Sequence, residues 1–132
     1  MESQHLLATI GQYALIRNGE GKLLVLERAR SKTWCLPGGR LQASEAWDVA
    51  LLREIAEETG LECANPRPVD VEVVTDPYQT KYCVYFALDP TSSPDVVLSD
   101  EHNAYRWISP QEVPTLPFES EGIRTAAQHL LE

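Results

Sequence analysis

The sequence has few basic residues and no long apolar run. Eleven lysines and arginines stand against twenty aspartates and glutamates, which gives a formal net charge of −9. Nucleic acids and anionic membranes bind basic surfaces, so this balance argues against both as partners. No apolar run approaches the roughly 18 residues that span a bilayer, and residues 1–12 lack the basic start and apolar core of a signal peptide. We therefore predict a cytoplasmic protein.

Cysteine and histidine are also scarce, with three of each. The cysteines form no CxxC pair and are odd in number, so we interpret them as packing residues in a reducing compartment rather than a disulfide framework. The histidines are scattered without the spacing of a zinc site. A transition-metal site built on these residues is therefore not expected: Cys35, Cys63, Cys83, His5, His102 and His129.

The remaining composition is that of a globular protein. A length of 132 residues with 43% hydrophobic residues fits one domain, which we predict over residues 1–132. Turn sequences at 18–21 and 76–79 predict two hairpins. Alternating apolar residues and flanking turns predict strands over 6–17, 22–28, 68–76, 80–88 and 104–109, a short extended piece over 34–39 and a loop over 89–94.

Two helices complete the expected order of elements. The first begins at Ser44 as its N-cap and ends before Gly60, which suits the left-handed position after a helix. After the last strand, Ser109 and Pro110 suit the N-cap and first position of a short helical turn, and residues 123–131 form the closing helix. This order predicts an α+β fold with mostly antiparallel strands.

The segment REIAEETGL, residues 53–61, carries three glutamates within five positions. At about 100° per residue, Glu54, Glu57 and Glu58 share one face of the first helix. A solvated face is the ordinary interpretation, but such faces usually carry compensating lysines, and this helix has none. The opposite side, which we predict to be the core stripe, carries Val49, Leu52 and Ala56.

Clustered carboxylates repel one another unless they are protonated or neutralised by a cation. Oxygen ligands without His or Cys favour Mg²⁺, Mn²⁺ or Ca²⁺. A second feature lies just before the helix: residues 28–40, RARSKTWCLPGGR, contain four basic residues and no acid. This segment is either an anion-binding loop beside a cation site or a loop that happens to be basic, and its basic residues are Arg28, Arg30, Lys32 and Arg40.

Residues 39–61, GRLQASEAWDVALLREIAEETGL, resemble the Nudix box of the Nudix hydrolases, G-x5-E-x7-R-E-U-x-E-E-x-G-U, where U is a bulky aliphatic residue. Every fixed position of the pattern is met, and the preceding WCLPGG resembles the usual lead-in of the family. The box is met at Gly39, Glu45, Arg53, Glu54, Ile55, Glu57, Glu58, Gly60 and Leu61. The resemblance implies a Nudix-type α/β/α sandwich with a mixed, largely antiparallel sheet.

The resemblance also implies roles for the residues of the box. Nudix hydrolases cleave a nucleoside diphosphate linked to another moiety, and they use Mg²⁺ or Mn²⁺. By position, Glu57 and Glu58 are implied metal ligands, together with the backbone carbonyl of Gly38. Glu54 is implied as a metal ligand or as the base that takes a proton from water. Glu45 and Arg53 resemble the pair that orients the loop and the helix.

The family often uses one further acid from a later loop. Glu101, in SDEHNAYRWIS, precedes a predicted strand and a tryptophan, so it is the candidate for an additional metal ligand or base. Its neighbour Asp100 is the rival, and the choice between Glu54 and Glu101 as base stays open.

The small size resembles the MutT-like nucleoside triphosphate pyrophosphohydrolases, which release a nucleoside monophosphate and pyrophosphate. Pro77 and Tyr78 loosely match the markers of two other subfamilies, so ADP-ribose, nucleotide sugars and dinucleoside polyphosphates remain alternative substrates. A non-catalytic nucleotide sensor is a further alternative. LPFESEGIR lacks the asparagine that reads oxidised dGTP in some members.

The partner expected from these features is a small nucleotide, with the basic residues of 28–40 as phosphate contacts. The resemblance leaves a homodimer open, although no heptad pattern argues for one. Aromatic side chains that could stack on a base are Tyr13, Tyr78, Tyr82 and Phe118, although each could equally be a packing residue.

Overall fold

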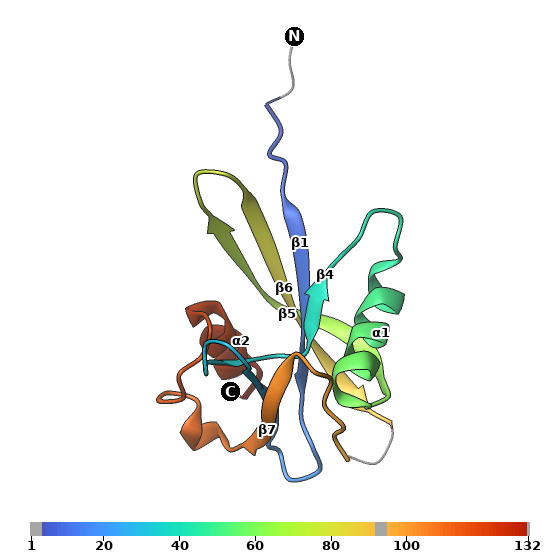
Figure 1. Ribbon diagram of the computed structural model, residues 1–132, viewed down its shortest axis with the longest axis vertical. Helices are drawn as coiled ribbons and strands as arrows, with labels where there is room; N and C mark the ends of the chain where they lie inside the picture. The colour runs from blue at the N-terminus through green and yellow to red at the C-terminus, as the bar shows by residue number, and fades with distance from the viewer. Residues whose placement is uncertain (1–3, 92–94, 132) are drawn as a thin grey trace.

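The computed structural model describes residues 4–91 and 95–131. Its strands form two sheets that lie between two helices (Figure 1). The four-stranded sheet has the order β4 (Gly38–Arg40), β1 (Thr9–Ile16), β6 (Thr80–Pro90), β5 (Cys63–Thr75). The three-stranded sheet has the order β3 (Trp34–Cys35), β2 (Leu23–Arg28), β7 (His102–Ile108). The helices are α1 (Trp47–Thr59) and α2 (Glu121–Leu131), with a 3₁₀ turn, η1, over Pro110–Glu112.

The strands pair as a mixed sheet and an antiparallel sheet. β1 pairs with β6 in parallel, and every other ladder between the named strands is antiparallel. The prediction of an α+β fold with mostly antiparallel strands is confirmed. The two helices lie on opposite sides of the strands in Figure 1, as an α/β/α sandwich requires.

The first predicted hairpin is wrong. β1 and β2 meet only at the turn, through a bridge between Arg17 and Leu23, and then diverge into different sheets. The burial pattern explains the divergence. Residues 23–26 are all buried and residues 14–16 are too, whereas a two-stranded ribbon would bury alternate side chains. Strands with such continuous apolar runs are stabilised when other elements pack on both of their faces, and the placement of β1 and β2 in separate sheets allows this packing.

The second predicted hairpin is confirmed. β5 and β6 pair around residues 76–79, where Asp76 Oδ1 accepts hydrogen bonds from the backbone N of Tyr78 at 2.7 Å and of Gln79 at 2.9 Å. Such Asx contacts fix the turn locally. β5 begins earlier than predicted, at Cys63, and bulges in its ladder carry it through two prolines. The predicted loop over 89–94 starts only after Pro90, and residues 92–94 lie outside the described residues.

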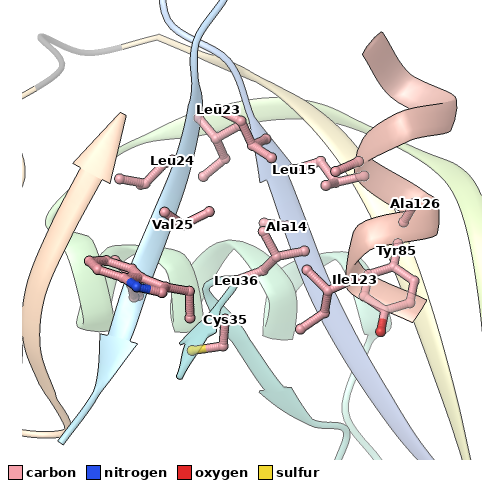
Figure 2. Close-up of a cluster of buried hydrophobic side chains, with 14 of the residues drawn as sticks. Ala14, Leu15, Leu23, Leu24, Val25, Cys35, Leu36, Tyr85, Ile123 and Ala126 are labelled. Atoms are coloured by element: carbon pink, nitrogen blue, oxygen red, sulfur yellow. The ribbon is translucent and has the colours of Figure 1, made fainter. Parts of the chain in front are cut away.

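The core forms where the two sheets and α2 meet (Figure 2). The cluster includes Ala14 and Leu15 from β1, residues 23–25 from β2, and Ile123 and Ala126 from α2. Cys35 and Cys83 are buried and Cys63 is partly buried, and all three are free thiols, in agreement with the prediction that they pack rather than pair. Of the helices in the described part of the chain, none has the length and apolar character needed to cross a membrane.

The start of α1 differs from the prediction, and its end does not. Ser44 is exposed and has φ 69°, so it lies in a left-handed loop and is not the N-cap; the helix begins at Trp47 after an extended Ala46. The loop is fixed instead by Glu45, whose Oε1 accepts from the backbone N of Gln42 at 2.8 Å. Gly60 has φ 73° and donates to the carbonyl of Ala56, as predicted.

The buried face of α1 is also not the predicted one. Val49 is 64% exposed, Ala56 is exposed and Leu52 is only partly buried. These three residues do share a face, but that face lies in solvent. The helix rests against β4, β1 and β5 on the side of its glutamates, so the buried residues are Ala50, Leu51, Ile55, Glu58 and Thr59. One glutamate of the cluster therefore lies inside the protein.

We expect Ile55→Ala to lower the free energy of unfolding by roughly 2–5 kcal/mol, because Ile55 is fully buried and its truncation leaves a cavity. Val49→Ala is the matched control on the same helix. It should change stability by less than about 0.5 kcal/mol, because exposed substitutions have small effects. Urea denaturation of both variants measures the difference, and equal losses would contradict the assigned buried face.

Candidate metal and catalytic site

The site centres on Glu58, a carboxylate that is only 5% exposed. It lies against the Gly-rich strand β4, where the backbone N of Gly38 is 3.5 Å from its Oε1. Burial raises the pKa of Glu58 to about 8; the Gly38 N–H opposes this shift, and the neighbouring carboxylates Glu54 and Glu101 add to it. A carboxyl that would ionise easily in water is therefore held in surroundings that disfavour its charge.

Glu101 and His102, where β7 begins, complete a group with Glu58. Each of the three residues offers one ligand atom, and these atoms lie within 4.8 Å of one another. Glu101 is exposed and His102 is buried. The structure thus brings Glu101 close to Glu58, and its role as metal ligand or base stays a prediction. Sequence analysis missed His102, because the only signal was its position beside Glu101 and no histidine spacing marked it.

The group fits a divalent cation. Carboxylates packed this closely disfavour each other's ionisation, and a bound cation would remove that penalty. Within the described residues, the buried Nδ1 of His102 has no hydrogen-bond partner, so the group also holds an orphaned polar atom that an ion or its water could satisfy. Glu58 and Glu101 offer the oxygen ligands that Mg²⁺ and Mn²⁺ prefer.

The other two glutamates of the helix lie at the edge of this group. The Glu54 carboxylate packs over Gly39, where a Cβ would come within 3.3 Å of its Cδ and Oε2. Glu57 points toward solvent, with its Oε1 3.5 Å from Arg53 Nε and a side chain that is 59% exposed. The structure thus gathers Glu54 and Glu58 beside the glycines of β4 and leaves Glu57 outside.

Arg53 joins the loop to the helix. Its Nη1 donates to Glu45 Oε2 at 2.6 Å and its Nη2 to Glu54 Oε1 at 3.2 Å. The hydrogen bond from Arg53 holds the pKa of Glu45 below its usual range, and the contact with the backbone of Gln42 acts in the same direction. Arg53 therefore contacts one carboxylate of the site and the loop before the helix, and the orienting role implied for Glu45 and Arg53 stays a prediction.

Gly38 has the backbone conformation that only glycine adopts easily at this place. Its φ is 150°, and a Cβ there would lie 2.0 Å from the carbonyl oxygen of Gln12. Without that side chain, β4 can lie close to β1, and Glu58 can reach the peptide of residue 38. The carbonyl of Gly38 as a metal ligand stays a prediction.

The predicted substrate contacts lie in different places. Arg28 Nε donates to Glu119 Oε1 at 2.8 Å, and Arg28 and Arg30 line a surface hollow with Asp100 and Glu101. Lys32 and Arg40 are exposed. Tyr78 is 95% exposed at the tip of the β5–β6 hairpin, and Phe118 is buried with the Arg124 guanidinium 5.1 Å from its ring centroid. The structure therefore brings only Arg28 and Arg30 close to an acid of the site.

A cavity of about 190 Å³ lies beside the carboxylates, between the four-stranded sheet and α2. Cys35 connects the two places, because it lines the cavity and its Sγ is 3.6 Å from His102 Nε2. Lys81 Nζ donates to the Tyr13 hydroxyl at 2.7 Å on one side of the cavity. On the other side Glu72 accepts from the Tyr85 hydroxyl at 2.9 Å, from Ser120 Oγ at 3.2 Å and from the backbone N of Gly122 at 3.1 Å.

The two sheets, the glycine-rich strand β4 and the glutamate helix define a Nudix-type fold with an acidic site at one end of α1. A family model described as the NUDIX domain matches residues 8–129. This chain therefore belongs to the Nudix family, and it is an enzyme of the pyrophosphatase-type hydrolase class.

Individual relatives agree with this assignment. A MutT-like protein of Streptomyces ambofaciens is 30% identical over 122 residues, which cover 89% of this chain and 75% of that protein. A putative 8-oxo-dGTP diphosphatase of Bacillus subtilis is 28% identical over 106 residues, or 80% of this chain and 70% of that protein. The crystal structure of a MutT protein from Methanosarcina mazei superposes with a TM-score of 0.79 at 28% identity, over 96% of this chain and 94% of that one.

Without divalent cations, the raised pKa of Glu58 predicts that stability falls as the pH rises. Between the ordinary carboxyl pKa of 4.5 and about 8, the folded protein holds a proton that the unfolded chain has lost. Unfolding then releases a proton and becomes more favourable with rising pH. The glutamine of Glu58→Gln stays neutral, so the variant lacks this dependence. The free energy of unfolding of the variant, relative to that of the wild type, should therefore rise by at least about 2 kcal/mol between about pH 5 and pH 8.

Denaturation in EDTA at several pH values measures this change. Glu20→Gln, in the exposed β1–β2 turn, is the control and should follow the wild type. A difference between the wild type and Glu58→Gln that does not vary with pH would show that Glu58 ionises normally in the folded protein.

Proposed function

We propose that this protein hydrolyses nucleoside triphosphates to a nucleoside monophosphate and pyrophosphate, with Mg²⁺ or Mn²⁺ as the cofactor. The observation that carries the proposal is the buried carboxylate of Glu58, grouped with Glu101 and facing Gly38, next to a cavity of about 190 Å³. The carboxylates Glu58 and Glu101 suit a cation and the phosphates bound to it. The cavity, which has both apolar and polar side chains in its lining, suits a nucleoside. The similarity to the putative 8-oxo-dGTP diphosphatase of Bacillus subtilis supports this substrate class.

The chain's own residues divide the chemistry. When bound, divalent cations neutralise the bridging phosphate oxygens and lower the pKa of the attacking water. Glu58 and Glu101 would hold the cation, with the Gly38 carbonyl as a further ligand. Glu57, which contacts Arg53 and points toward solvent, would have to turn inward to join them. Glu54, held by Arg53 beside Gly39, or Glu101, would take the proton of the water as it attacks a phosphorus in line with the leaving phosphate.

Positive charge is needed to hold a polyphosphate on an acidic protein. Arg28 and Arg30 line the hollow that also contains Glu101, so they are the proposed phosphate contacts closest to the site. Lys32 and Arg40 are exposed and could reach phosphates only from the outside. Arg28 also lines the cavity, which places one guanidinium at the junction between the proposed phosphate and nucleoside positions.

The cavity is the proposed position of the nucleoside. Its polar groups come from Lys81, Tyr13, Glu72 and Ser120, which could read the edge of a base while the apolar side chains contact its faces. Phe118 lies outside this lining, and Tyr78 is on the distant hairpin turn with Pro77, so neither aromatic favours an alternative substrate. A cytoplasmic location, one domain over residues 1–132 and a homodimer stay predictions.

We expect Mg²⁺-dependent release of pyrophosphate from a panel of ribo- and deoxyribonucleoside triphosphates, measured beside ADP-ribose, nucleotide sugars and dinucleoside polyphosphates. Glu58→Gln should lose about 10² or more of the rate, because it removes a buried charge that holds the cation. Glu20→Gln changes an exposed glutamate far from the site and should keep the wild-type rate.

The panel also decides between the substrates. Faster turnover of ADP-ribose or a dinucleoside polyphosphate than of every triphosphate would replace the proposed substrate class. Tight nucleotide binding without any turnover would indicate a nucleotide sensor and contradict the proposed enzymatic function.

A second pair of variants tests the cavity. Val74 and Val73 are neighbours on β5 with similar exposure, 46% and 49%, but only Val74 lines the cavity. We expect Val74→Trp to raise KM for the preferred nucleotide by about tenfold or more, because the indole fills the space that a nucleoside needs. Val73→Trp should leave KM within about twofold, because its side chain lies on the other face of the strand. Equal effects of the two variants would place the nucleoside elsewhere.

A further inference from the structure

We propose that His102 supplies a nitrogen ligand to the cation held by Glu58 and Glu101, so that this centre binds transition-metal ions such as Mn²⁺, Co²⁺ and Zn²⁺ more tightly than Mg²⁺. The inference rests on the proposed metal-dependent function, because it assigns a further ligand and a metal preference to the same site. It concerns a side chain that no fixed position of the Nudix box contains.

The fold turns His102 into the site. It is the first residue of β7 and follows the exposed Glu101 of the preceding turn, and the ligand atoms of both side chains lie within 4.8 Å of that of Glu58. His102 is 6% exposed. Its partner across the ladder is Arg28, at a register irregularity between Glu27 and Arg28, and such bulges re-aim the side chains beside them.

The two ring nitrogens of His102 have different surroundings. Nε2 is 3.6 Å from Cys35 Sγ, a buried thiol. Nδ1 is buried and has no hydrogen-bond partner among residues 4–91 and 95–131. When Nε2 carries the proton and donates it toward the sulfur, the Nδ1 lone pair is free, and fixing the tautomer in this way is how neighbouring groups prepare a metal-binding histidine. His102 therefore combines a buried Nδ1 without a hydrogen-bond partner and a ring that contributes one of the three converging ligand atoms.

The surroundings of His102 suit the neutral ring that a ligand must be, because the side chain is buried and its partner across the ladder is the cationic Arg28. Burial also raises the pKa of the Cys35 thiol to about 12, so the sulfur remains a neutral hydrogen-bond partner. Cys35 is not one of the three residues whose ligand atoms converge.

A nitrogen ligand changes the metal preference of an acidic site. Mg²⁺ strongly prefers oxygen ligands and gives up its water reluctantly, whereas imidazole suits transition-metal ions. The group of one imidazole and two carboxylates is therefore a mixed nitrogen and oxygen site. The alternative is that His102 only donates a hydrogen bond to a carboxylate; in that case it would orient the carboxylate and would not distinguish one ion from another.

Nitrogen-15 NMR of the full chain, labelled at histidine, separates the two possibilities without measuring turnover. The chain contains three histidines, so three imidazole spin systems are expected, and His102→Asn and His129→Asn assign them. On addition of Zn²⁺ we expect a ring nitrogen of His102 to shift as metal ligands do, while Mg²⁺ leaves it unchanged. Zn²⁺ that binds without moving the His102 nitrogens overturns the proposal, and this result needs no variant of His102 to fold.

Calorimetric titration with Co²⁺ and Mg²⁺ gives the second readout. His102→Asn should weaken Co²⁺ binding by about tenfold or more and Mg²⁺ binding by less than about threefold, because only the first ion gains from the nitrogen. His129→Asn, which changes an exposed histidine paired with Asp70, is the control and should alter neither. Equal weakening of both ions would make His102 an orienting residue and overturn the proposal.

The proposed function can fail separately. Mg²⁺-dependent turnover together with an unaffected His102 ring would retain the hydrolase and remove the nitrogen ligand. A shifted His102 ring with no turnover of any nucleotide would retain the ligand and remove the hydrolase.

Discussion

The structure depends on an ionisable side chain in a place where charge is costly. Glu58 belongs to the same buried stripe of α1 as Leu51 and Ile55, so the packing that fixes the helix on the sheets also holds a carboxylate out of water. Protein interiors tolerate such a group only when it is neutral or paired. The surrounding features, a close peptide, further carboxylates and a buried imidazole, therefore describe a site that a cation would complete.

The glycines before the helix make this arrangement possible. A side chain at residue 38 would collide with the backbone of β1, and one at residue 39 would press on the Glu54 carboxylate. β4 can therefore approach β1 closely, with the backbone N of Leu41 donating to the carbonyl of Ile10 at 2.8 Å, and the helix can approach β4. Arg53 then holds the intervening loop through Glu45. The intervals between the fixed positions of the box thus allow residues of one strand, one loop and one helix to contact one another.

Local signals in the sequence predicted the local features. Gly60 ends α1, Asp76 shapes the β5–β6 turn, and the positions of the box predicted the contact between Glu45 and Arg53. The errors concern long-range packing. The prediction that β2 pairs with β1 in a hairpin fails because these strands, although neighbours in the sequence, lie in different sheets.

The buried face of α1 was misjudged for a related reason. Periodicity groups the residues of a helix into faces but does not say which face meets the sheets. The prediction of a core stripe opposite the glutamates is therefore wrong. His102 was missed because its partners, Cys35 and Glu58, are distant in sequence. Because the site is assembled from three separate segments, its residues have no fixed interval in the sequence that could be recognised as a motif.

The same geometry explains how an acidic protein could handle a polyphosphate. Arg28 is engaged with Glu119, and Arg53 is engaged with three glutamates, so much of the basic charge near the site is already balanced. The attraction for phosphate would then come largely from the cations proposed at Glu58 and Glu101, which would make the metal both a catalyst and a condition for binding. The cavity beside Cys35 needs no such charge, because it can select the nucleoside by shape and hydrogen bonds. Catalysis and substrate choice would therefore be set by different residues that meet at one thiol, and either could change during evolution without loss of the other.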